Sequence, residues 1–170
     1  MGTLERFLLG FVLAVAPAFA LADAPADPVA LTVTFSPRFE SDLRTAYGAD
    51  QAPVLRDAIV TSVTSALKRK AAGKQVSIDV VLEWAKPSHP TPFQLDREPG
   101  LDFQRSKSLG GAGLTATIRA PDGRELGRVE YTFYPANLWE ASPAIETWAD
   151  ATRSIVGFAS EVAKKVSAVG

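Results

Sequence analysis

Four segments of the chain alternate apolar and polar residues, with the period of two that is typical of half-buried strands. They run from Val29 to Phe35, from Val76 to Trp84, from Leu114 to Arg119 and from Arg128 to Tyr134. In the second segment the alternation puts Trp84 on the apolar side. A Pro-Asp-Gly sequence lies between the last two segments and favours a turn, so these segments are predicted to form a hairpin.

Apolar residues recur at helical spacing in other parts of the chain. Residues 51–72 carry an apolar residue at every fourth position, and basic residues followed by a glycine close this segment. Residues 142–166 carry a broader apolar stripe that includes Ile145, and Ser142-Pro143 has the residue types of an N-cap and a first helical position. A similar Ser-Pro pair precedes residues 37–47, for which we predict a shorter helix.

The predicted elements follow the order β-α-α-β-β-β-α. One side of each predicted strand is mostly polar, whereas a sheet covered on both faces shows continuous apolar runs. We therefore predict an α+β fold, a two-layer α/β sandwich in which a four-stranded mixed sheet carries two long helices on one face. The polar side of the sheet consists of Thr32, Thr34, Ser77, Asp79, Glu83, Thr115, Thr117, Arg119, Arg128, Glu130 and Thr132.

The N-terminus has the features of an export signal. An apolar run ends in small residues with the spacing that signal peptidase recognises, at Ala20 and Ala22, and it is shorter than the roughly 20 residues that span a bilayer. We predict a cleavable signal peptide at 1–22, a flexible leader at 23–28 and a single domain at 29–170. The mature protein is then periplasmic, without a stable membrane anchor; the alternative is an uncleaved anchor.

Composition restricts the chemistry. The 170 residues include no cysteine and one histidine, which excludes disulfides, thiolate metal sites, a cysteine nucleophile and sites built from two histidines. The net charge is −1, and the 18 basic residues are spread along the chain, which disfavours binding to nucleic acid. We expect no cofactor and no nucleic-acid partner.

Residues 86–111 are rich in proline and glycine, and we predict a long irregular loop, of a kind that is often functional. His89 directly follows a serine and could act as a general base for a serine nucleophile. Asp96 and Asp102 contribute to an acidic cluster that could hold a metal ion. The simpler interpretation is an exposed, non-catalytic histidine and a solvated acidic loop. The glycines at 110–113 are predicted to form a bend or bulge that leads into the next strand.

Aromatic residues gather near the end of the hairpin and the start of the last helix. Tyr131, Phe133 and Trp148 fall on predicted buried stripes, which favours a role in the core. Tyr134 and Trp139 fall outside these stripes and could stack on a sugar. A carbohydrate-binding module for cell-wall glycan is therefore one alternative function.

The hairpin segment from Leu114 to Tyr134, with its Pro-Asp-Gly turn, is followed by an amphipathic segment from Trp139 to Val166. In this pattern the chain resembles a loose group of small bacterial periplasmic and outer-membrane-lipoprotein-like domains of unknown function. It differs from the lipoproteins because it has no lipid-bearing cysteine. The resemblance implies no active-site residues.

These observations favour an exported, non-enzymatic binding or scaffold domain that acts on a protein partner in the cell envelope. An edge strand of the sheet could accept a chain of that partner by strand addition. An envelope hydrolase or metal-dependent enzyme that uses loop 86–111 is an alternative. The oligomeric state is left open, and the candidate interaction surface consists of His89, Asp96, Asp102, Arg119, Arg128, Glu130, Tyr134 and Trp139.

Overall fold

The structure is a computed structural model, and it describes residues 29–169. The predicted signal peptide at 1–22, with its cleavage residues Ala20 and Ala22, and the predicted leader at 23–28 lie outside the described residues.

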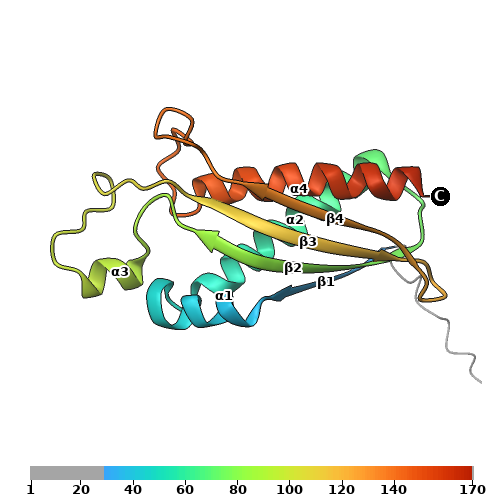
Figure 1. Ribbon diagram of the computed structural model, residues 1–170, viewed down its shortest axis with the longest axis horizontal. Coiled ribbons are helices and arrows are strands. Elements are labelled where there is room, and N and C mark those ends of the chain that lie inside the picture. The colour runs from blue at the N-terminus through green and yellow to red at the C-terminus, as the bar shows by residue number, and fades with distance from the viewer. Residues whose placement is uncertain (1–28, 170) are drawn as a thin grey trace, which may run out of the picture.

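Four strands form one mixed sheet, in the order β1-β2-β3-β4 (Figure 1). Their bounds are Val29–Phe35 for β1, Val76–Lys86 for β2, Gly111–Arg119 for β3 and Glu125–Phe133 for β4. β1 pairs with β2 in parallel, and the other two pairs are antiparallel. The predicted hairpin is therefore confirmed, and β1 and β4 are the two edges of the sheet.

Two long helices, α2 (Gln51–Lys70) and α4 (Ala149–Ala168), lie side by side on one face of the sheet (Figure 1). The connection after β1 consists of α1 (Pro37–Asp42), in which the Ser36 hydroxyl caps the first turn, and a π-helical turn (Leu43–Tyr47). The structure confirms the predicted order of elements, the mixed four-stranded sheet and the single layer of helices.

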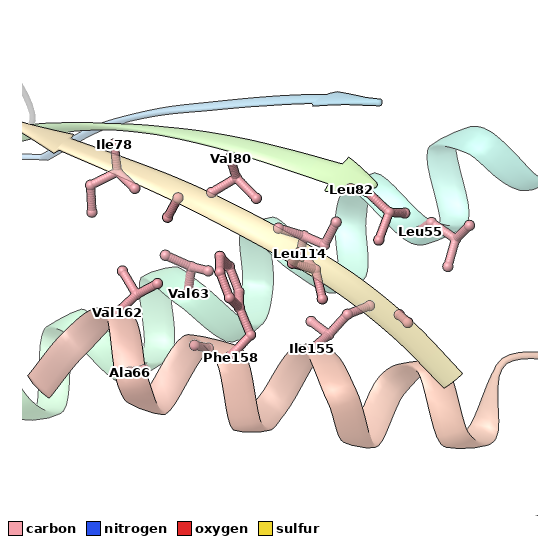
Figure 2. Packing of buried hydrophobic residues seen from close by; sticks show 14 of the residues in the cluster. Leu55, Val63, Ala66, Ile78, Val80, Leu82, Leu114, Ile155, Phe158 and Val162 are labelled. Carbon is pink, nitrogen blue, oxygen red and sulfur yellow. The ribbon is translucent and has the colours of Figure 1, made fainter. Parts of the chain in front are cut away.

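The core lies between the sheet and the two long helices (Figure 2). Ile78 from β2 and Leu114 from β3 point from the sheet toward Val63 of α2 and Phe158 of α4, and all four side chains are buried. Their burial removes apolar surface from water, which is the main favourable contribution to folding. The opposite face of the sheet carries the predicted polar side chains.

A bulge in β2 turns Trp84 to the other face of the sheet. Leu82 pairs with Leu114, but Trp84 pairs with Gly113, so β2 has one more residue than β3 in this interval. The prediction that Trp84 lies on the apolar face is therefore wrong, and Ala85 takes the buried position. A Cβ atom on Gly113 would clash with the Trp84 indole, which explains the need for glycine there.

The structure also corrects the prediction for the glycines at 110–113. Gly111 and Gly113 are paired residues within β3 and do not form a bend before it. Gly111 lies so close to the β4 chain that a Cβ atom there would approach the carbonyl oxygen of Phe133 to 2.5 Å. Small residues at these positions therefore let neighbouring backbone and aromatic groups approach β3.

Residues 86–111 are less irregular than predicted. β2 extends to the first of them and β3 begins at the last, and α3 (Pro92–Arg97) lies between. Thr91 and Gln94 form a capping box, in which the side-chain oxygen of each residue accepts a hydrogen bond from the backbone N–H of the other. The Thr-Pro-x-Gln pattern is the signal that would have predicted this helix.

The last helix begins later than predicted, at Ala149 and not at Ser142-Pro143. The backbone N–H of Ser142 donates to the carboxylate of Asp150, so this segment folds back against the first turn of α4. The apolar spacing predicts that Ile145 is buried, but its side chain is 59% exposed, so this prediction is wrong.

Ile155 and Val156 are neighbours in α4 that test the position of the core. Ile155 is fully buried, whereas Val156 is 56% exposed. We expect Ile155→Ala to lower the free energy of unfolding by roughly 2–5 kcal/mol, because it leaves a cavity. Val156→Ala should change it by less than about 0.5 kcal/mol. Urea unfolding of both variants makes the comparison, and equal losses would contradict this packing.

Candidate functional site

A buried network at the start of α4 joins the chain segments that surround it. The Ser88 hydroxyl donates to Oδ2 of Asp150 at 3.0 Å and accepts from the Asp150 backbone N–H at 3.1 Å. The Ser142 N–H donates to Oδ1 of the same carboxylate at 2.7 Å. All three residues are buried, so these bonds fix the start of segment 86–111 and the β4–α4 connection against the helix.

Charge also favours this position of the carboxylate. Asp150 lies in the first turn of α4, where a negative charge interacts favourably with the helix dipole. Nη1 of Arg153 lies 3.5 Å from Oδ1 of Asp150 and donates to the carbonyl oxygen of Glu140 at 2.7 Å. We interpret this network as a structural latch, which we call the Asp150 latch: Ser88, Ser142, Asp150 and Arg153.

His89 is only 3% exposed, so the prediction of an exposed histidine is wrong. Its Nδ1 lies 2.8 Å from the carbonyl oxygen of Phe103, and its ring packs against the Phe103 ring. Ser88 bonds to Asp150 and not to this ring. The neighbouring serine and histidine therefore have separate partners, and their contacts do not connect a nucleophile to a base.

The two acidic residues of the same segment have different surroundings. Asp96 is exposed in the last turn of α3. Asp102 builds a turn, because its Oδ1 accepts the backbone N–H groups of Gln104 and Arg105 at 2.9 Å each. Within residues 29–169, no group of three or more His, Asp or Glu side chains could hold a metal ion.

A small pocket of about 260 Å³ lies beside this segment and is lined by Tyr47, Lys86, His89 and Gln94, among others. Burial raises the pKa of the Tyr47 phenol above its ordinary value, and the Asp42 carboxylate raises this pKa further. The neutral phenol is therefore the form that the folded protein favours.

The Asp150 latch predicts a specific loss of stability. Ser88→Ala removes both hydrogen bonds and leaves a buried carboxylate oxygen and a buried N–H without their partner. We expect the free energy of unfolding to fall by roughly 2–3 kcal/mol. Ser167→Ala, on an exposed position of α4, is the control and should change it by less than about 0.5 kcal/mol. Similar denaturation midpoints for the two variants would show that the latch does not stabilise the fold.

Tyr47 predicts a loss of stability at high pH. Because the folded-state pKa is raised, the unfolded chain loses this proton first. The contribution of Tyr47 to stability is complete below the unfolded pKa of about 10 and falls as the pH rises through the folded value. Urea unfolding between pH 9 and 11 should show a smaller decline in the free energy of unfolding for Tyr47→Phe, which lacks this phenol, than for the control variant Tyr134→Phe. The idea is wrong if both variants decline as the parent protein does.

Three of the predicted surface residues lie together on the open face of the sheet. Arg119 lies 3.5 Å from the Asp79 carboxylate, and the Arg128 guanidinium lies 3.0 Å from the Glu130 carboxylate. These ion pairs are largely exposed, and such pairs stabilise a fold by about 0–1 kcal/mol. They form a solvated charged surface over β3 and β4.

The two remaining predicted residues are both exposed but have different surroundings. Tyr134, 45% exposed, packs edge-on against Trp84 with ring centres 6.3 Å apart, and Lys86 lies over its ring. Trp139 is 97% exposed, on a turn that the Asn137 and Glu140 side chains hold through hydrogen bonds. Among residues 29–169, the aromatic partner of Tyr134 is thus Trp84, and the structure does not pair it with Trp139.

The two edge strands differ in their charge and regularity. β4 carries Glu125, Arg128 and Glu130, and its pairing with β3 shifts register near its start. Charges and register shifts of this kind discourage the addition of another strand. β1, Val-Ala-Leu-Thr-Val-Thr-Phe, has no charged residue, glycine or proline, and its pairing with β2 is regular throughout.

Every second residue of β1 directs its backbone groups away from the sheet. Ser36, which follows β1, donates its N–H to the carbonyl oxygen of Leu82 in β2. Because the backbone groups of successive strand residues point to opposite sides, the groups of Val29, Leu31 and Val33 point outward. The Val29, Leu31 and Val33 side chains are half-buried on the helix side.

An apolar groove lies beside this edge, between β1 and α2. It has a volume of about 480 Å³, and its lining includes Val29 and Leu31 from β1 and Val60 and Leu67 from α2, with Lys68 also contributing. Among residues 29–169, no other strand pairs with the outer edge of β1, so this edge combines outward-pointing backbone groups with an apolar recess. The sequence predicts strand addition at an edge strand but does not identify these residues, because strand order is not a local property of the sequence.

No helix within residues 29–169 is long and apolar enough to cross a membrane. Comparison of the chain with protein-family models, with curated proteins and with solved structures found no match. The resemblance to periplasmic and lipoprotein-like domains therefore stays a prediction.

Proposed function

We propose that this protein is an exported, non-enzymatic binding domain of the cell envelope that holds a protein partner by strand addition at β1. One observation carries the proposal: β1 is a regular, charge-free edge strand beside an apolar groove, whereas the opposite edge, β4, carries charges. Proteins normally protect an edge strand, and an unprotected edge is suited to pairing with another chain.

Strand addition uses both features of this edge. An added strand gains main-chain hydrogen bonds from Leu31 and Val33, and these bonds depend little on its sequence. Its alternate side chains would enter the groove between β1 and α2, where Val60 and Leu67 select for apolar residues. The preferred partner is thus an extended segment with apolar residues at every second position.

The location in the envelope follows from the N-terminal sequence. The predicted signal peptide at 1–22 would direct the chain to the periplasm, where a domain without cysteine depends on packing for its stability. The alternative enzyme in segment 86–111 gains no support from its contacts, because Ser88 serves the Asp150 latch and His89 bonds to a backbone carbonyl.

Site-specific photo-crosslinking tests the proposed surface in the producing cells. A photoreactive residue in place of Thr32, which is exposed on β1, should form a discrete adduct with a polypeptide. The same residue in place of Thr132, which is exposed on the other edge strand, is the matched control and should form little. Leu31→Lys should reduce the adduct at position 32 several-fold, because it places a charge in the groove.

Equal yields at the two positions, or no adduct at position 32, would contradict strand addition at β1. Circular dichroism of the Leu31→Lys variant provides the control for folding. If this variant keeps its helix and strand signal but loses the adduct, the loss reflects the docking surface.

A further inference from the structure

We propose that the strand added at β1 is the β1 strand of a second copy of this chain, so that two sheets join into one continuous sheet across a twofold axis. The inference rests on the proposed function, because it names the partner of the same edge.

The β1 sequence is symmetric in its chemistry about Thr32. Apolar residues lie at 29, 31, 33 and 35 on the helix side, and Ala or Thr lies at 30, 32 and 34 on the open side. An antiparallel copy centred on Thr32 therefore places apolar residues opposite each other on the helix side and small residues opposite each other on the open side, where Ala30 meets Thr34 and Thr32 meets its own copy. No like charges meet, whereas like charges directly opposite each other destabilise a pair of strands.

The direction of the backbone groups fits the same centre. Since the groups of Leu31 and Val33 point outward, Leu31 can exchange both hydrogen bonds with Val33 of the second copy, and the twofold axis repeats this exchange. Thr32 then faces Thr32 of the second copy in a non-hydrogen-bonded pair, which brings the two Cα atoms to about 4.5 Å.

The helix layer offers a matching surface. The groove is lined by a stripe of α2 that includes Val60, Thr64 and Leu67, and Val60 is one of the larger apolar side chains that remain exposed. In the antiparallel pair, Val33 of the second copy lies opposite Leu31, at this groove. Twofold pairing covers both grooves with the same contacts, as an isologous interface requires.

Single cysteines test this geometry, because the chain has none of its own. Under mild oxidation of the purified protein, Thr32→Cys should form a disulfide-linked dimer, since Cα atoms about 4.5 Å apart lie within disulfide range. Thr34→Cys is the matched control: its twin lies four residues out of register, at roughly 13 Å, beyond that range. Thr132→Cys on β4 controls for random collision.

Charge at the same position gives a second, independent measurement. Thr32→Lys and Thr32→Glu should each halve the apparent mass in light scattering, because like charges meet at the axis. An equimolar mixture of the two variants should restore the dimer. This result does not depend on oxidation, and the recovery in the mixture shows that both variants are folded.

The inference is overturned if the protein is a monomer at micromolar concentration, or if Cys at 32 and Cys at 34 crosslink equally. If the protein is a monomer but position 32 still photo-crosslinks to a different polypeptide, the proposed function stands and only the second copy is wrong. If position 32 yields neither a dimer nor an adduct, both proposals fall.

Discussion

The packing of α2 and α4 on one face of the sheet is the interaction on which the rest of the structure depends. It buries Ile78, Leu114 and Phe158 in one continuous core. Because both long helices lie on that face, the other face is open to water and carries polar and charged side chains, such as the ion pairs of Arg119 and Arg128. Among the described residues the sheet ends at β1 and β4, and the outward backbone groups of these edges are a second surface that can form hydrogen bonds.

The two edges meet this constraint differently, and the difference points to function. On β4, charged residues and the close packing of α4 reduce the opportunity for another strand to pair. Within residues 29–169 neither protection is present on β1, and a groove lies between β1 and α2 that no described side chain fills. The candidate site is therefore a backbone edge and a recess, and it does not depend on any reactive side chain.

Much of the fold could be predicted because local patterns and tertiary packing agree. The alternation in β1 and β4 matches the side of the sheet that the structure half-buries under the helices, and the apolar repeat in α2 matches the face that it buries. Disagreement arises where a long-range contact overrides the local pattern. The bulge that re-aims Trp84 depends on the glycine opposite it, and the late start of α4 depends on Asp150 binding Ser88 and Ser142. The capping box at Thr91, by contrast, is a local signal that is present in the sequence itself.

The sequence by itself determined the class of fold, the one-sided sheet and the absence of thiol chemistry, because residue periodicity and residue type are local properties. Only the tertiary structure decided which strands are edges, where His89 is buried, and how Tyr134 and Trp139 are separated. These features depend on strand order and on contacts between residues far apart in the chain. The β1 edge illustrates both. Its lack of charged residues can be read from its seven-residue sequence, but its position at an edge follows from the strand order, in which β2 is its one neighbour among the described strands.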